Sequence, residues 1–382
     1  MRPRFLKTFL ALGALFSAAA LGAAAPPRWQ KVQQHGDVPP PVWEAGVAFA
    51  RVDPAGTQPD TLYRFGGQRG AFPAEFTVKY FYALDLDTAT WTRLTSPQTP
   101  SRRANPQLIP GPCPGCVSVL GGRGVFDGVD RTFSDMSTYR ERSGRWARVP
   151  SESVGDRFAI RRSAGSIVEV PNANDPRQKT YYLFGGIGNT LITTPDGLRN
   201  DVAIYDRETG WRLIETFGAK PAPRAWTAGV YDPAKNSILI FGGYRLGDDG
   251  GAFGPDTFEN DLWSLSLDTF TWTRLQPQGP IPSKRDNPTL FFDTAHGWLV
   301  LFGGQGFDRV SNDLWYYSVA ENRWTEVVLP STSRIPRGRV GGTSFVRETR
   351  KAFELYIHSG ATRVRNETVF LNDLWKLTWP KE

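Results

Sequence analysis

The sequence predicts an all-β protein made of six similar units, each with four short antiparallel strands, closed into a ring. Three observations lead to this prediction. Tryptophan followed closely by valine or leucine recurs at six places, namely Trp29, Trp91, Trp146, Trp211, Trp272 and Trp324. A double glycine ends an apolar run at five places between them, at residues 66–67, 121–122, 185–186, 242–243 and 303–304. Aromatic side chains are 13% of the 382 residues, with 39 glycines and 30 prolines, a composition typical of short strands joined by tight turns.

One unit, residues 224–275, shows how each element is predicted. Residues 228–231 form a short strand that ends in a turn at 232–236. Residues 237–241 are an almost continuous apolar run, as expected of a strand covered on both faces, and Gly242-Gly243 ends it. A long polar loop, a third strand over 261–266 with period-two alternation, and an outer strand over 272–275 complete the unit. Because one unit cannot bury its own faces, the six must pack around a common axis.

The number of units follows from the third strands, which we expect at residues 80–84, 135–139, 201–205, 261–265, 313–317 and 373–377. The last of these is followed by too few residues for a fourth strand. The motif that begins at Trp29 has no unit of its own. We therefore expect the N-terminal strand to complete the sixth unit, which ties the two ends of the chain together and hides the free sheet edges.

The repeated motifs resemble those of the kelch-repeat family. The resemblance rests on the apolar run into Gly-Gly, on the Asn-Asp-Leu-Trp sequence at 260–263, 312–315 and 372–375, and on the tryptophan of each outer strand. It covers nearly all of residues 26–382 and implies a single six-bladed kelch-type β-propeller. We place the blades at about 41–95, 102–150, 160–216, 223–276, 284–329, and 336–379 with 28–33. The fold alone does not fix the function, since such propellers include carbohydrate-active enzymes as well as protein-binding modules.

The first 25 residues have the pattern of a cleaved signal peptide. Arg2, Arg4 and Lys7 precede an apolar stretch over 9–21, and small residues follow it. A retained membrane anchor is the alternative, but the stretch is short for a bilayer span. We expect a secreted or periplasmic protein with no membrane span in the mature chain. Removing three basic residues from the formal charge of +7 leaves about +4, spread along the chain, which does not favour nucleic acid as a partner.

The two cysteines, Cys113 and Cys116, flank a Pro-Gly pair. Pro-Gly is turn chemistry, and strand-like segments lie on either side at 107–109 and 117–120. In an oxidising compartment we expect a small disulfide at the tip of a hairpin. A thiol-exchange role remains an alternative, although no thioredoxin-like βαβ pattern surrounds the pair. A zinc site would need a second pair of ligands, so we expect no metal.

An alignment of the first strands predicts a ligand site. The position two residues after Arg224 and its counterparts give the order Trp-Asn-Arg twice, namely Trp43, Asn105, Arg162, Trp226, Asn287 and Arg339. This order indicates that three blades were duplicated into six. First strands lie nearest the axis of a propeller, so we expect these side chains, with Glu44 beside them, to surround one mouth of the central channel. Guanidinium groups suit anions and indoles suit sugar rings, but the same residues could serve packing and hydrogen bonding alone.

Two functions are consistent with the sequence. The first is a secreted, non-catalytic, monomeric propeller without a cofactor, which binds a protein or a glycan, anionic ones included, through the loops on one face. The second is a periplasmic carbohydrate-active enzyme of the sialate mutarotase or epimerase type, which the exported six-bladed layout resembles. In that enzyme the arginines of the channel mouth would hold an anionic sugar while Glu44 moves a proton. The sequence shows no other catalytic constellation.

Overall fold

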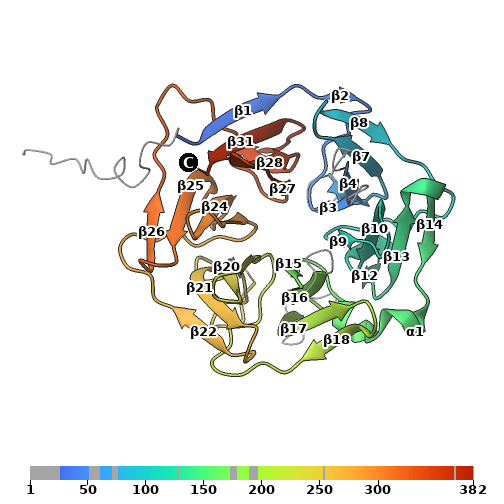
Figure 1. The fold of residues 1–382 in the computed structure, drawn as a ribbon, viewed down its shortest axis with the longest axis horizontal. Helices are drawn as coiled ribbons and strands as arrows, with labels where there is room; N and C mark the ends of the chain where they lie inside the picture. The colour runs from blue at the N-terminus through green and yellow to red at the C-terminus, as the bar shows by residue number, and fades with distance from the viewer. Residues whose placement is uncertain are drawn as a thin grey trace, which may run out of the picture.

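Six sheets, each built on four antiparallel strands, surround a central axis in the computed structural model (Figure 1). The structure describes residues 26–50, 61–70, 76–126, 129–172, 179–188, 197–252, 254–364 and 367–381. The expected signal peptide, residues 1–25, lies outside the described residues. The all-β, six-bladed propeller predicted from the repeats is confirmed.

Each blade is built in chain order from the axis outward. Blade 1 contains β3 (Gly46–Ala50), β4 (Thr61–Phe65), β7 (Phe81–Asp85) and β8 (Thr90–Arg93), with the short β2 (His35–Gly36) beside β8. Blade 2 contains β9 (Gln107–Pro110), β10 (Cys116–Leu120), β13 (Met136–Arg140) and β14 (Arg145–Arg148). Blade 3 contains β15 (Ser166–Pro171), β16 (Lys179–Ile187), β17 (Leu198–Asp206) and β18 (Gly210–Ile214).

The second half of the ring repeats this plan. Blade 4 contains β19 (Ala228–Asp232), β20 (Ser237–Tyr244), β21 (Phe258–Ser266) and β22 (Trp272–Leu275). Blade 5 contains β23 (Thr289–Asp293), β24 (Trp298–Gln305), β25 (Val310–Ser318) and β26 (Arg323–Glu326). Blade 6 contains β27 (Thr343–Glu348), β28 (Ala352–His358), β31 (Leu374–Pro380) and β1 (Arg28–Val32). The N-terminal strand therefore closes the ring, since β1 pairs with β31 from Arg28↔Thr378 to Val32↔Leu374.

The double glycines bring the backbone of the next blade close to the second strand. In blade 4, Gly242 and Gly243 have φ of +63° and +107°, and the register of β20 against β21 shifts there. A Cβ atom on Gly242 would lie 2.6 Å from the carbonyl oxygen of Arg285 in blade 5, so no larger residue fits without movement. The N–H of Gly243 donates to that same carbonyl at 2.9 Å. The glycine pair is thus a joint between blades.

Past this joint the second and third strands continue toward one face of the ring. In blades 3, 4 and 5 the strands are continuous. In blades 1, 2 and 6 the continuations are separate two-stranded ribbons, formed by β5 (Gln68–Arg69) with β6 (Phe76–Thr77), β11 (Arg123–Phe126) with β12 (Val129–Thr132), and β29 (Ala361–Val364) with β30 (Glu367–Phe370).

The tryptophan of the outer strand packs against the blade before it. In four blades its contact is the phenylalanine that precedes the double glycine, with ring centroids 4.7–5.6 Å apart in the pairs Trp29–Phe302, Trp146–Phe65, Trp272–Phe184 and Trp324–Phe241. Trp91 meets His358 instead, at 5.0 Å, and Trp211 shares an apolar cluster with Leu120. The two repeated signals of the sequence therefore meet between neighbouring blades. Apolar clusters of this kind form the core and join the blades in pairs.

The seam between blades 6 and 1 uses a different contact. Ser359 takes the place of the first glycine, with φ of +65°. Its hydroxyl donates to the carbonyl of Val42 at 2.6 Å and accepts from the N–H of Val42 at 3.1 Å. The departure from Gly-Gly at Ser359-Gly360 is therefore a specific joint for the point where the ring closes.

Blade 2 carries two local features. Cys113 and Cys116 form a disulfide at the tip of the β9–β10 hairpin, as expected. The linker from blade 2 to blade 3 contains two short helices, α1 (Ser151–Val154) and α2 (Arg157–Ile160), and the turn before β14 contains the 3-10 helix η1 (Glu141–Ser143). The helical turns of the linker were not predicted, because four-residue helices leave no periodic pattern in a sequence.

We expect Trp29→Ala to lower the free energy of unfolding by about 3–5 kcal/mol, because the buried indole joins the closing strand to blade 5. Gln30→Ala, on the exposed side of the same strand, should change it by less than about 0.5 kcal/mol. Urea unfolding of both variants measures the difference. An unchanged midpoint for Trp29→Ala would show that the ring does not depend on β1.

Candidate functional site

A buried arginine precedes the first strand in five of the six blades. In blade 4, Nη1 of Arg224 donates to the carbonyl of Gly242 at 3.1 Å and to Asp261 at 2.6 Å, and Nη2 donates to the other carboxylate oxygen at 3.1 Å. The Trp263 indole also donates to Asp261, at 2.7 Å. Burial alone would raise the pKa of Asp261, but the Arg224 guanidinium and the indole hold it below its usual range. We call this arrangement the arginine clamp, because it joins the first three strands of a blade.

The predicted ligand residues Arg162 and Arg339 belong to these clamps. Nη1 of Arg162 donates to Gly185 at 2.9 Å and to Asp201 at 2.7 Å. Arg339 makes the same contacts with Ser359 at 3.0 Å and Asp373 at 2.8 Å. Both side chains are buried, and burial lowers the pKa of Arg162 to about 10. The structure thus places these two arginines inside their blades and not at the channel mouth.

In blades 3 and 6 the sequence alignment matched the wrong residue to Trp226. It used Arg162 and Arg339, which lie two positions before the true counterparts. The backbone bridges Ser163↔Ile187 and Ala225↔Tyr244 make Arg162 equivalent to Arg224, not to Trp226. In blade 1 the matched residue changes by one position, because the bridge Trp43↔Gln68 makes Trp43 the counterpart of Ala225. Glu44, not Trp43, is therefore the counterpart of Trp226.

With this correction, six residues with a left-handed backbone form what we call the axial ring. They are Glu44, Asn105, Ala164, Trp226, Asn287 and Gly341, with φ between +47° and +60°. The N–H of Glu44 donates to Gly341, that of Asn105 to Glu44, that of Trp226 to Ala164 and that of Asn287 to Trp226, at 2.7–2.9 Å. These hydrogen bonds link each of these blades to its neighbour at the start of the first strands. They hold the residues of the axial ring in place around the channel.

The residue after each double glycine adds a second layer, the axial rim. Its members are Gln68, Arg123, Ile187, Tyr244, Gln305 and Ala361, each bridged to the residue just before the ring. Blades 3 and 6 contribute only small or apolar side chains to the ring and the rim. Blades 1 and 2, and on the other side blades 4 and 5, contribute the polar and aromatic ones. This alternation preserves the pseudo-twofold order that the sequence indicated.

Five predicted site residues therefore come together at one mouth of the channel, namely Trp43, Glu44, Asn105, Trp226 and Asn287. The sequence reasoning missed Gln68, Arg123, Tyr244, Asp286 and Gln305. Four of these directly follow a double glycine, a position that the sequence marks clearly. Arg123 brings the guanidinium that Arg162 and Arg339 do not, with Nη2 3.4 Å from Gln68 Oε1 and 3.7 Å from Glu44 Oε2.

Asp286 is the unusual acid of this mouth. It lies directly before the ring residue Asn287 and is almost fully buried. Burial raises its pKa from 3.8 to about 8, the Asn287 side chain opposes this rise, and the charge of Glu44 adds to it. Near neutral pH the carboxyl of Asp286 thus keeps its proton, and the nearby charge of Glu44 is one of the causes. Such shifts are concentrated at functional sites.

Several buried polar atoms at this mouth have no hydrogen-bond partner among the described residues. They are Trp43 Nε1, Gln68 Nε2, Asn105 Nδ2, Trp226 Nε1 and Asp286 Oδ1. Leaving a buried donor or acceptor unpaired costs about 1–3 kcal/mol each, and the five at the mouth belong to a wider set that also includes the indoles of the outer strands. The set contains four N–H donors and one carboxyl oxygen, all buried from solvent, so a molecule at the channel mouth would reach them only when these side chains move.

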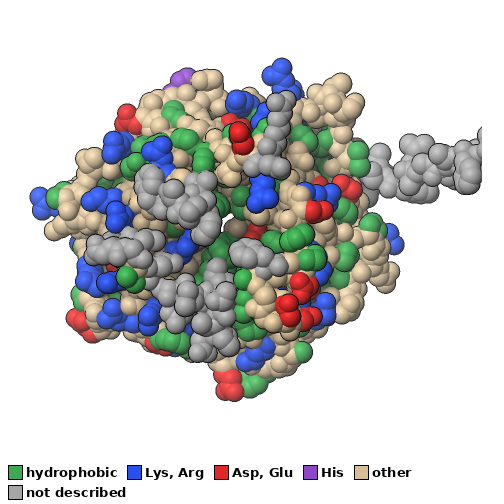
Figure 2. Space-filling view, turned by 180° about the vertical axis from the view of Figure 1, so that it is seen from behind, with side chains coloured by type: hydrophobic (Ala, Val, Ile, Leu, Met, Phe, Trp, Pro, Cys, Tyr) green, Lys and Arg blue, Asp and Glu red, His purple; other side chains and the backbone are tan. Residues whose placement is uncertain are grey.

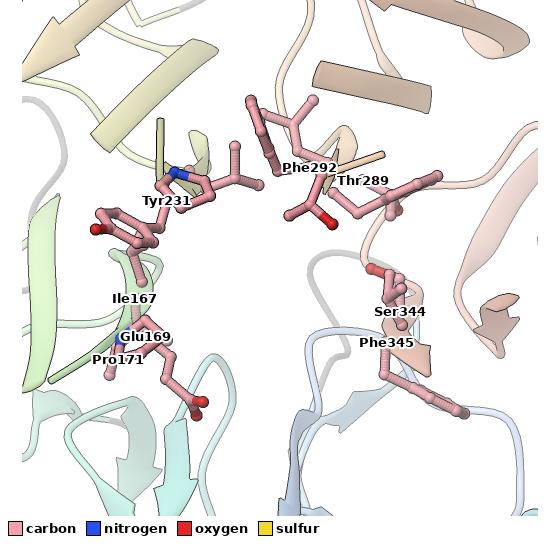
Figure 3. A pocket seen from close by; sticks show the side chains of 16 residues that line it. Ile167, Glu169, Pro171, Tyr231, Thr289, Phe292, Ser344 and Phe345 are labelled. Carbon is pink, nitrogen blue, oxygen red and sulfur yellow. The ribbon is translucent and has the colours of Figure 1, made fainter. Parts of the chain in front are cut away.

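The other end of the channel has a different character. A cavity of about 520 Å³ is lined by the first strands of blades 3 to 6, with Ile167, Tyr231, Phe292 and Phe345 among the side chains (Figure 3). Glu169 is its charged residue, and Lys179 pairs with it at 3.0 Å. From behind, the ring shows a narrow opening at its centre with charges of both signs around it (Figure 2). The polar mouth, not the apolar end, is therefore the candidate site.

Within the described ranges, no three His, Cys, Asp or Glu side chains are grouped so that they could hold a metal ion. No helix in the same ranges is long and apolar enough to cross a membrane.

A family model, the KLHDC2/KLHL20/DRC7 Kelch-repeats domain, matches residues 173–381, more than half of the sequence. The chain belongs to the kelch-repeat family. This confirms the family expected from the motifs. Kelch propellers generally act as protein-interaction modules, and the shared motifs lie in the clamps and joints described above rather than at the mouth.

Individual relatives of this kelch chain differ in kind. It is 28% identical over 308 residues to the N-(sulfonatooxy)prop-2-enimidothioate sulfolyase of Thlaspi arvense, covering 76% of this chain and 80% of that protein. It is 27% identical over 301 residues to Kelch domain-containing protein 2 of Bos taurus, covering 71% and 66%. It is 29% identical over 231 residues to host cell factor 1 of Homo sapiens, covering 52% of this chain and 10% of that much longer protein.

We expect Arg224→Met to destabilise the protein by about 3–5 kcal/mol, because it leaves the buried carboxylate of Asp261 without its cation. Lys235→Met, in an exposed turn of the same blade, is the matched control and should have little effect. Thermal and urea unfolding measure both. The clamp would not be structural if Arg224→Met unfolded at the wild-type midpoint.

We expect Asp286→Asn to gain stability over wild type as the pH rises. The pKa of Asp286 is higher in the folded than in the unfolded protein. The stability that its carboxyl contributes is therefore fully present below about pH 4 and is lost as the pH rises through about 8. The gain near pH 9 should be on the order of 3 kcal/mol and should shrink toward pH 5. Urea unfolding at both pH values tests this, with the exposed Asp308→Asn as control. A gain that does not change with pH would contradict the shift.

Proposed function

We propose that this chain is an exported, non-catalytic kelch propeller that binds a glycan or a partner protein through the face around the polar mouth, with a sugar ring entering the mouth itself. The observation that carries the proposal is the gathering of five buried polar atoms without partners at one opening. A ligand that offers both donors and acceptors would satisfy them.

The chemistry of the mouth favours a sugar. Trp226 provides an indole in the ring next to Asn287, and Asn105 holds the equivalent ring position in blade 2. Flat aromatic surfaces near amide and carboxyl groups suit the apolar faces and hydroxyls of a sugar ring. Arg123 adds a positive group, which would accommodate an anionic sugar. A protein partner would reach these groups only with a protruding side chain, and the rest of its contact would lie on the surrounding loops.

Export is supported by two features of the chain. The first 25 residues have the pattern of a signal peptide, and the Cys113–Cys116 disulfide suits an oxidising compartment. Native mass spectrometry of protein recovered outside the cytoplasm tests this part of the proposal, as well as the monomeric state. A mass that still includes the first 25 residues would contradict export with cleavage.

A second candidate function rests on Asp286. A carboxyl group that keeps its proton near neutral pH, within reach of the charge of Glu44, is an arrangement that can supply a general acid and a general base. A carbohydrate-active enzyme of the mutarotase or epimerase type would use such a pair at this mouth, with Arg123 as the group that holds an anionic sugar. The similarity to the sulfolyase over most of both chains is consistent with an enzyme, and carries no substrate over to this one.

We expect Asn105→Gly to weaken sugar binding by about tenfold, since Nδ2 of Asn105 is one of the unpartnered donors and one hydrogen bond contributes about 0.5–1.5 kcal/mol. Glycine preserves the positive φ of this position, so the fold should remain. Ala164→Gly is the matched control, because it lies in the same ring without a polar group. A glycan array on residues 26–382 supplies the ligand, and calorimetry with that ligand compares the variants.

Three outcomes separate the candidates. Equal affinity of Asn105→Gly and wild type would remove the mouth from the site. Selection of proteins but no glycan would leave a protein-binding module. Turnover of a bound sugar that Asp286→Asn abolishes while binding remains would establish the enzyme instead.

A further inference from the structure

A second cavity, of about 800 Å³, lies over blade 2, apart from the axial mouth. Its walls are the linker that leads into the blade, the segment from β12 into β13, the outer strand β14, and the helical linker that leads out. Residues 98–101, 131–135, 146–148 and Arg157 contribute to the lining. None of them belongs to the axial ring or the axial rim.

Three arginines come to this cavity from three of its walls. They are Arg131 on β12, Arg148 on β14 and Arg157 on α2. The structure records no ion pair for Arg131 or Arg148 with any described residue. Arg157 is held by Ser134, whose carbonyl accepts from Nε at 3.3 Å and whose hydroxyl accepts from Nη2 at 3.1 Å.

The acid of the cavity does not neutralise them. Asp135 lines the cavity but belongs to the clamp of blade 2, where both oxygens accept from Arg103 at 2.8 and 3.1 Å. The positive charge of the three arginines is therefore left to a ligand or to counterions. The hydroxyls of Ser101, Thr132 and Ser137 add neutral donors to the same lining.

The wall that carries Arg157 is a special feature of this blade. The linkers before Arg103, Arg224, Arg285 and Arg339, all described, contain no helix, whereas the linker before Arg162 folds into α1 and α2. Asp156 caps α2 by accepting from the N–H of Phe158 at 2.9 Å, and Ala159 and Ile160 are fully buried. The backbone at Arg157 is thus fixed, although nothing in the propeller scaffold requires a helix there.

We propose that this cavity binds a compact anion of the sulfate or phosphate monoester class, with Arg131, Arg148 and Arg157 as its ligands. Guanidinium groups match the oxygens of such esters, and donors from three walls surround a compact group. An extended acidic peptide would instead need its cations in a row along one groove. The inference does not rest on the proposed sugar site, since the two sites share no residue.

Calorimetry with residues 26–382 tests the proposal, using inorganic phosphate, inorganic sulfate, glucose 6-phosphate and glucose 6-sulfate as probes. We expect saturable binding of at least one ester, weakened by added salt. Arg131→Gln and Arg148→Gln should each lower its affinity about tenfold, as the loss of one charge-assisted contact implies. Comparison of the phosphate and sulfate arms identifies which anion the cavity prefers.

Arg145→Gln is the matched control, because Arg145 is an exposed arginine on the same strand that does not line the cavity. It should leave the affinity within about twofold of wild type. The proposal would be overturned by the absence of saturable binding for all four anions, by an equal loss in Arg145→Gln, or by much tighter binding of an acidic peptide. Circular dichroism of each variant ensures that any loss is not caused by unfolding.

Discussion

The buried arginine of the clamp is the interaction on which the rest of this propeller depends. Its guanidinium joins the start of the first strand to the first glycine carbonyl of the second and to the aspartate of the third. The carbonyl of the same arginine accepts from the second glycine of the preceding blade, for example Arg285 from Gly243 at 2.9 Å. One residue therefore orders the strands of its own blade and fixes the distance to the next. The axial ring begins two positions later, so the shape of the channel mouth follows from the clamps.

Part of the cost of this design lies at the mouth. Four residues of the ring other than glycine and alanine, namely Glu44, Asn105, Trp226 and Asn287, hold a positive φ, which larger side chains adopt at some energetic expense. Asp286 is buried with a raised pKa, and several donors lack partners. The clamps and the Trp–Phe contacts carry part of the cost as well, since Nη2 of Arg162 and of Arg339 and the indole N–H of each tryptophan in those pairs also lack a described partner. Local departures from the ordinary rules of packing and hydrogen bonding are expected where a protein binds its ligand.

Much of the fold could be predicted because its signals repeat. The spacing of the tryptophans and double glycines gave six blades and the closing strand, and the structure adds that the two signals touch between neighbours. The site was predicted in part. Trp226, Asn105 and Asn287 were found because they are large or polar residues at the aligned first-strand position. Blades 3 and 6 have the inconspicuous Ala164 and Gly341 at that position. The alignment therefore chose the arginines two residues earlier in those blades. Only backbone pairing resolves such a shift. The helical linker and its arginine were not predictable, since a four-residue helix depends on local capping and burial.

The most direct test of the polar mouth is a crystal structure of residues 26–382 with the sugar that binds best, at a resolution that shows ordered water. The account predicts a ligand seated on the axial ring, with hydrogen bonds from the amides of Asn105 and Gln68 and from the indole of Trp226, and with Asp286 facing it. A sugar bound elsewhere, or a mouth in which these groups pair with one another and leave no opening, would contradict it.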